Sequence, residues 1–176
     1  PTPPRADFQI DLEAVERALT ENTRAVILNS PNNPSGALYS ADTLRALAEL
    51  LRSHKARTGN TVYLISDEPY RELVYDVPFA PSAISYYDDT IICYSFSKAM
   101  SIPGERIGYV AVPKSVTDAA LVFAAVAGAG RALGYVNASS LFQRVAAACV
   151  NDTADLAVYA ENRRLLLDGL RSMGFT

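Results

Sequence analysis

Hydrophobic positions along the chain fall into two kinds of segment, continuous apolar runs and amphipathic stretches. The continuous runs predict buried strands, at 24–30 (RAVILNS), 61–66 (TVYLIS), 90–95 (TIICYS) and 106–112 (RIGYVAV). Apolar residues spaced three and four apart predict helices, at 10–22, 40–59 and roughly 115–128, 138–150 and 154–172. Continuous apolar strands separated by a helix are typical of a parallel sheet covered on both faces. The pattern therefore predicts an α/β fold, with a mostly parallel sheet sandwiched by helices and followed by further helices.

The helix predicted at 40–59 also carries start and stop signals. Ser40 is a suitable N-cap, and Lys55 and Arg57 complement the helix dipole in the last turn. Gly59 suits the left-handed residue that ends many helices. These signals fix the bounds of this helix more closely than those of the others.

Short polar segments follow directly on three of the predicted strands. They are Asn33 after the first, Asp67 after the second, and Ser95 to Lys98 after the third. If the strands are parallel, all three segments emerge at the carboxyl edge of one sheet, where open α/β sheets bind ligands. The strand pattern alone therefore predicts that these distant residues meet at one crevice.

Lys98 and Asp67 each have a functional and a structural interpretation. A lysine amine attacks carbonyl groups when desolvation or a nearby cation lowers its pKa, but an isolated lysine at a strand end is more often solvated. A carboxylate at a strand end often caps the next turn, whereas a buried one would keep a heterocyclic nitrogen protonated. Tyr70, three positions after Asp67, could reach a neighbouring phenolic oxygen.

The remaining candidates are similarly open. Asn33 lies between prolines in NSPNNPSG, which is first of all a turn, although it would also make a rigid hydrogen-bond donor. Arg106 is either a surface ion-pair partner or a bidentate clamp on a phosphate group. Glu68 and Glu105 are interpreted as solvated or structural.

Composition excludes several classes of protein. Of the 176 residues 49% are hydrophobic and 20% charged, and the net charge of −3 comes without a basic block, so no nucleic-acid partner is expected. The longest apolar run, 119–130, is too short to span a bilayer, so no membrane association is expected. Cys93 and Cys149 lack metal-ligand spacing. They predict buried free thiols, no metal site and a reducing, cytoplasmic location.

Three motifs occur along the chain in the order NSPNNPSG, SDEPYRELVYD and SFSKAMSIPGERIGY. Together they resemble the class I/II aminotransferases, the aspartate aminotransferase-like branch of the fold-type I pyridoxal-phosphate enzymes. The resemblance covers essentially the whole chain. It implies that residues 1–130 are part of the cofactor-binding large domain, without its N-terminal part. It also implies that residues 131–176 are a helical linker and the truncated start of the C-terminal small domain.

The resemblance implies a role for each residue around the ring of pyridoxal 5'-phosphate. Lys98 would form the Schiff base with the cofactor aldehyde, and Asp67 would pair with the pyridine nitrogen. Asn33 and Tyr70 would hydrogen-bond the phenolic oxygen of the ring. Lys98, Asp67 and Tyr70 are therefore the expected catalytic residues.

The resemblance also implies a phosphate site. Arg106, with Ser95 and Ser97, would hold the phosphate group of the cofactor. The chain departs from the family at Ser35, where the Asn-Pro-Thr-Gly turn usually has threonine, and this change keeps the hydroxyl group.

The implied activity is transfer of an amino group between an α-amino acid and a 2-oxo acid, by a homodimer. Three alternatives remain: a β-lyase, cyclase or decarboxylating relative, a cofactor-binding domain of a transcriptional regulator, and a non-enzymatic α/β scaffold. The family's ring-stacking aromatic residue and substrate-carboxylate arginine are expected outside these 176 residues. We therefore expect a piece of a longer protein that is inactive by itself.

Overall fold

The structure is a computed structural model that describes residues 1–175. Its helices and strands alternate along the chain, except that two strands follow one another without an α-helix between them, and the last three elements are helices. They are α1 (Leu12–Ala18), β1 (Ala25–Asn29), α2 (Ala41–Thr58), β2 (Tyr63–Asp67), β3 (Thr90–Ser95), α3 (Phe96–Ala99), β4 (Gly108–Ala111), α4 (Ala119–Ala132), α5 (Ser140–Ala148) and α6 (Leu156–Ser172). Short 3-10 turns lie at Ala83–Ser85 and Pro103–Glu105.

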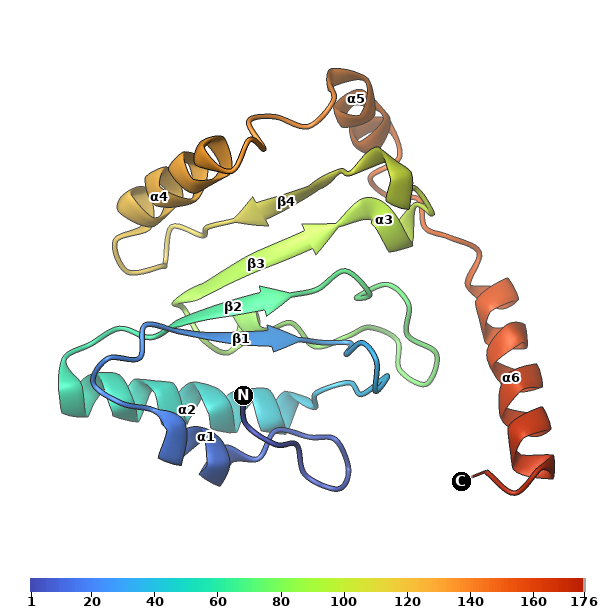
Figure 1. Cartoon of the computed structure of the whole chain (residues 1–176), viewed down its shortest axis with the longest axis horizontal. Coiled ribbons are helices and arrows are strands. Elements are labelled where there is room, and N and C mark those ends of the chain that lie inside the picture. Colours follow the sequence, from blue (N-terminus) through green and yellow to red (C-terminus); the bar gives the residue numbers. More distant parts are fainter. Residues whose placement is uncertain (176) are drawn as a thin grey trace.

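The four strands form one sheet in the order β1-β2-β3-β4. The first three strands are parallel, and β4 pairs with β3 in the antiparallel direction. Their arrows in Figure 1 accordingly point one way for β1, β2 and β3 and the other way for β4. The predicted α/β fold with a mostly parallel sheet is confirmed.

Helix α2 packs on one face of the sheet and contributes Leu44, Leu47, Ala48 and Leu51 to the core. The side-chain oxygen of Ser40 accepts a hydrogen bond from the backbone N–H of Thr43, and Gly59 ends the helix with a left-handed φ of 72°, as the sequence predicts. Leu47 and Leu51 are fully buried. They share this core with Leu28 and Leu64 of the sheet and with residues of α1, the loops and a 3-10 turn: Ile10, Val15, Val62, Ala83 and Tyr87.

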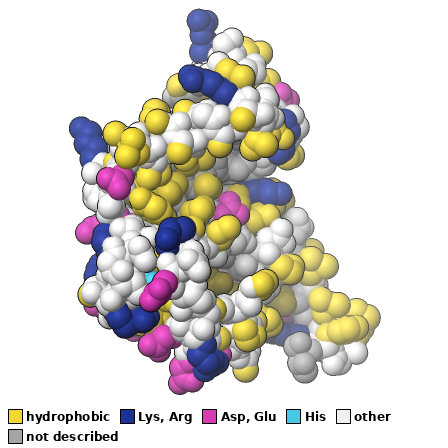
Figure 2. Space-filling view, turned by 60° about the vertical axis from the view of Figure 1, so that its left-hand side comes forward, with side chains coloured by type: hydrophobic (Ala, Val, Ile, Leu, Met, Phe, Trp, Pro, Cys, Tyr) yellow, Lys and Arg dark blue, Asp and Glu magenta, His cyan; other side chains and the backbone are white. Residues whose placement is uncertain are grey.

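The two faces of the sheet are covered unequally. In β1, Leu28 lies in the core beneath α2, whereas Ile27 points to the opposite face and is 72% exposed. Helix α4 lies beyond β4, and its Leu121 and Phe123 are 71% and 63% exposed. Figure 2 shows hydrophobic side chains gathered on the upper part of the visible surface and again at lower right.

Several bounds differ from those expected. Helix α3, only four residues long, follows β3 at once and is too short to produce a periodic pattern. Helix α4 begins at Ala119 instead of about 115, because 112–118 form a loop that ties back to the core. Helix α6 has no buried residue and stands apart from the sheet in Figure 1. Within residues 1–175, no helix combines the length and apolar character needed to cross a lipid bilayer.

Candidate active site

The parallel strands deliver the predicted polar segments to one edge of the sheet. Asn29, Asp67 and Cys93 lie side by side in register across β1, β2 and β3. Asp67 is the last residue of β2, and Ser95 is the last residue of β3 and the N-cap of α3, which carries Lys98. The turn with Asn33 follows β1 at the same edge, which is where the arrows of these three strands end in Figure 1. The three segments therefore converge, as the strand pattern predicts.

A chain of hydrogen bonds joins the β1 and β2 segments. The side-chain amide of Asn29 donates to Asp67 Oδ2 (3.1 Å), and Asn29 Oδ1 accepts from the backbone N–H of Asn33 (2.8 Å). The side-chain amide of Asn33 then donates to the hydroxyl of Tyr70 (3.2 Å). Asn29 thus links the carboxylate to the Asn33–Tyr70 pair and fixes the spacing between them.

The pKa of the Asp67 carboxyl group lies above its usual range. Burial at the sheet edge raises its pKa, and the hydrogen bond from Asn29 lowers it in part. A cationic nitrogen next to this carboxylate would reverse the shift, because an opposite charge favours the ionised form. The site is therefore suited to a positively charged group.

Lys98 is half-buried and lies next to Tyr70. Its amine nitrogen, Nζ, is 5.5 Å from the centroid of the Tyr70 ring, within the range of a cation–π contact. The amine of α3 therefore reaches the loop that follows β2, close to the Asn33–Tyr70 hydrogen bond. The fold therefore brings together Lys98, Tyr70 and Asn33, which come from three separate segments of the chain.

Ser95, Ser97 and Arg106 lie at the start of α3 and the turn before β4. Ser95 Oγ donates to Ser97 Oγ (2.7 Å) and accepts from the Ser97 backbone N–H. Arg106 has a left-handed φ of 53°, is exposed, and donates to the carbonyl oxygen of Pro103 (2.6 Å). Two hydroxyl groups and a guanidinium group are thus available on one side of the site.

The predicted residues border two hollows. One, of about 880 Å³, is lined by Asp67, Ser95 and Arg106 together with Cys93 and residues of α4. The other, of about 860 Å³, is lined by Asn33 and Tyr70 and by apolar residues of the following loops. Within residues 1–175 neither hollow includes Lys98 or Ser97 in its lining. Asn29 bridges the two groups of residues through its bonds to Asp67 and Asn33.

The donor set around this edge fits pyridoxal phosphate in its chemistry. Its aldehyde needs an amine, its ring nitrogen a carboxylate, and its phenolic oxygen hydrogen-bond donors. Its phosphate group needs hydroxyl groups and a guanidinium group. Lys98, Asp67, the Asn33–Tyr70 pair and the Ser95–Arg106 group supply these functions at one end of the sheet.

Sequence reasoning missed Asn29 and the position of Cys93. The sequence pattern places Asn29 in a strand, although a polar residue that ends a buried strand is also the signal that singles out Asp67. The prediction of a buried thiol is wrong for Cys93, which is half-buried, lines the hollow of Asp67, and has a pKa raised by burial and by that carboxylate. Cys149 is also free and half-buried.

Comparisons with known proteins identify the family. All of residues 1–176 match the family described as aminotransferase class I and II. The chain is 34% identical over 176 residues to an aspartate/prephenate aminotransferase of Thermus thermophilus, covering 98% of the chain and 44% of that relative. It is 42% identical over 120 residues to a probable aspartate/prephenate aminotransferase of Thermus aquaticus, covering 68% of the chain and 30% of the relative.

A solved structure agrees with this assignment. An amino transferase from Eubacterium rectale is 51% identical and superposes with a TM-score of 0.93, over 98% of the chain and 44% of that protein. The chain thus spans less than half the length of the relatives that it matches. It belongs to the class I and II aminotransferase family.

Proposed function

We propose that the chain is part of a pyridoxal-phosphate-dependent aminotransferase that moves an amino group between an α-amino acid and a 2-oxo acid. The observation that carries this proposal is the hydrogen-bond chain from Asp67 through Asn29 and Asn33 to Tyr70, with the Lys98 amine next to it. A protein of this family needs these functions at one edge of a parallel sheet.

Each group of site residues would bind a different part of the cofactor. Lys98 binds its aldehyde covalently, and Asp67 pairs with its ring nitrogen. Asn33 and Tyr70 donate to its phenolic oxygen. Arg106, Ser95 and Ser97 bind its phosphate group, for which the hydroxyl pair and the flat guanidinium group are well shaped.

The same residues carry the proton transfers. Bound pyridoxal phosphate supplies an electron sink for the bond broken at the substrate Cα. Lys98 would hold the aldehyde, and its free amine would be the base that takes up the substrate Cα proton at Nζ and releases it again. The Asp67 carboxylate keeps the ring nitrogen protonated throughout, because the ion pair stabilises the charged form.

The whole protein extends this proposal beyond the 176 residues. Residues 1–130 belong to the cofactor-binding large domain, and residues 131–176 are a linker leading into a small domain. We infer a homodimer in the cytoplasm, with the substrate carboxylate bound by residues outside this chain. The relatives' names include aspartate and prephenate, so an acidic or aromatic amino acid is a reasonable first substrate to assay.

Borohydride reduction of the full-length protein with pyridoxal phosphate tests the proposal. We expect a yellow protein whose label, after reduction and peptide mapping, lies on Lys98, since the amine of this lysine adjoins Tyr70. A label on Lys55 or Lys114 would refute the site. Release of a 2-oxo acid and ammonia without any amino-group acceptor would contradict transamination and indicate a lyase.

A further inference from the structure

A buried carboxylate, that of Glu68, lies at the turn after β2, and the proposed chemistry does not use it. We propose that Glu68 is a positioning residue, which holds Asp67 and Tyr70 in place through hydrogen bonds with Ser66 and Ser82. This inference rests on the proposed function, because it assigns a reason for the geometry of that site. Within residues 1–175, Glu68 lines neither of the two hollows that the candidate site residues border.

The Glu68 carboxylate is buried, and among residues 1–175 only one of its two oxygens accepts hydrogen bonds. The residue is 2% exposed, and its Oε1 accepts hydrogen bonds from Ser66 Oγ (2.8 Å) and Ser82 Oγ (2.7 Å). Its Oε2 has no hydrogen-bond partner among residues 1–175, and the nearest cationic atom is Arg71 Nη1 at 3.9 Å. Burying a carboxylate with so few partners costs free energy, so a glutamate here indicates a specific role.

The two serines join distant parts of the chain beneath the site. Ser66 immediately precedes Asp67 in β2, and alternation along the strand directs their side chains to opposite faces. Ser82 stands before the 3-10 turn at Ala83–Ser85, and its hydroxyl bonds Glu68 instead of capping that turn. Glu68 therefore joins the two ends of the loop of residues 68–82, which carries Tyr70. It does so on the face of the sheet opposite to the Asp67 side chain.

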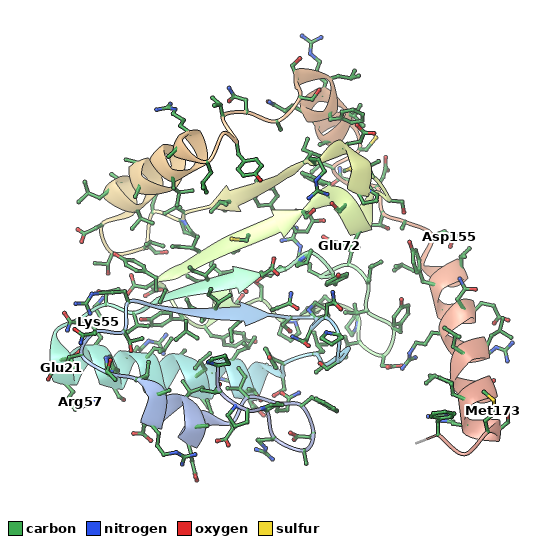
Figure 3. The ribbon with its side chains drawn as sticks, in the orientation of Figure 1. Glu21, Lys55, Arg57, Glu72, Asp155 and Met173 are labelled. Carbon is green, nitrogen blue, oxygen red and sulfur yellow. The ribbon has the colours of Figure 1, made fainter. Side chains whose placement is uncertain are left out.

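Arg71 ties the same turn to β3. Its guanidinium carbon lies 4.3 Å from the centroid of the Tyr94 ring, and its Nε donates to Glu72 Oε1 (2.9 Å). Figure 3 labels Glu72 at the carboxyl end of the strands, beside the candidate site. The backbone N–H of Glu68 also donates to the Cys93 carbonyl (2.9 Å). The turn from Asp67 to Arg71 is thus held by buried hydrogen bonds at Glu68 and by half-buried contacts at Arg71.

Glu68→Gln tests the proposal in the full-length protein, with Ser82→Ala as a milder second variant and Glu49→Gln as an exposed control. Glu68→Gln keeps the shape but removes the charge, and Ser82→Ala removes one donor. We expect the dissociation constant for pyridoxal phosphate to rise roughly tenfold in Glu68→Gln and less in Ser82→Ala, as for loss of a hydrogen bond to a charged group. Because both changes act on one network, the double variant should bind about as weakly as Glu68→Gln alone.

Two further measurements separate positioning from simple stabilisation. The pH midpoint of the absorbance of bound cofactor should shift in Glu68→Gln, whereas a purely stabilising residue would leave it unchanged. In the cofactor-free protein, amide hydrogen exchange of residues 67–71 should become faster in Glu68→Gln and Ser82→Ala but not in Glu49→Gln.

The outcomes distinguish this inference from the proposed function. A wild-type protein that does not bind pyridoxal phosphate would refute the function, while faster exchange at 67–71 would still support Glu68 as the residue that holds the turn. A wild-type protein that binds the cofactor, with an unchanged dissociation constant and exchange rate in both variants, would overturn the inference alone. Strictly additive effects of the two substitutions would also overturn it, since they would exclude a shared network.

Discussion

In the cofactor-free protein, burying the ionised Asp67 carboxylate costs free energy, and its neighbours offset only part of this cost. Burial raises its pKa, and the Asn29 amide lowers it in part, so its folded value stays above its unfolded value. Such a group favours folding below its unfolded pKa, and this contribution is lost as the pH rises through the folded pKa. Ionised Asp67 therefore weakens the cofactor-free fold at neutral pH.

We predict that Asp67→Asn raises the melting temperature of the cofactor-free protein at pH 7, because a neutral amide avoids this cost. The difference from wild type should vanish as the pH falls towards about 3, where the carboxyl group is protonated in both states. Thermal melts across this pH range check the prediction, with the exposed Asp88→Asn as the control. A lower melting temperature for Asp67→Asn at pH 7 would contradict it.

Single residues also show what the sequence reveals of the site. The convergence of Asn33, Asp67 and Lys98 can be predicted because each follows a recognisable strand, and parallel pairing then determines the edge where they emerge. Asn29 cannot be predicted in the same way, because nothing local distinguishes a strand-end asparagine that bonds a residue 38 positions away. The sequence leaves Glu68 either solvated or structural, and the fold shows that it is buried and bonded to Ser82.

At the scale of elements, α2 is the helix on which the sheet depends. It runs along the face of the sheet that is closed, and Leu47 and Leu51 are fully buried there. Its bounds could be predicted because Ser40 and Gly59 give unambiguous start and stop signals. The bounds of α4 could not, because its run of alanine and glycine continues the apolar pattern without a side-chain cap.

Leu47→Ala should lower the free energy of unfolding by about 2–5 kcal/mol, since it leaves a cavity in a fully buried position. Urea denaturation followed by circular dichroism measures this loss. Glu49→Ala on the exposed side of the same helix is the matched control and should change stability by less than about 0.5 kcal/mol. Equal losses in the two variants would mean that α2 does not pack as described.

At the scale of the whole molecule, one face of the sheet is closed, and the other, the open face, is uncovered at β1 although Ile91 of β3, in the same register row, is only 8% exposed. Ile27 projects from the open face, and Leu121 and Phe123 of α4 are equally uncovered. Figure 2 shows hydrophobic side chains over the upper part of the visible face. Exposed apolar surface marks an interface or a tendency to associate where it forms large patches. The relatives are more than twice as long as the part that the chain matches, so they have further residues that could cover such surfaces.

We therefore predict that the 176-residue chain by itself associates in solution. Sedimentation velocity at increasing protein concentration should show species larger than the monomer of 19.0 kDa. Ile27→Thr and Phe123→Ser together should shift the distribution towards the monomer without lowering the melting temperature, because both side chains are mostly exposed and contribute little to the core. Leu47→Ala, which weakens the core instead, should increase association. A chain that stays monomeric at every concentration would show that the open face needs no partner, and an unchanged distribution in the double variant would place the contact elsewhere.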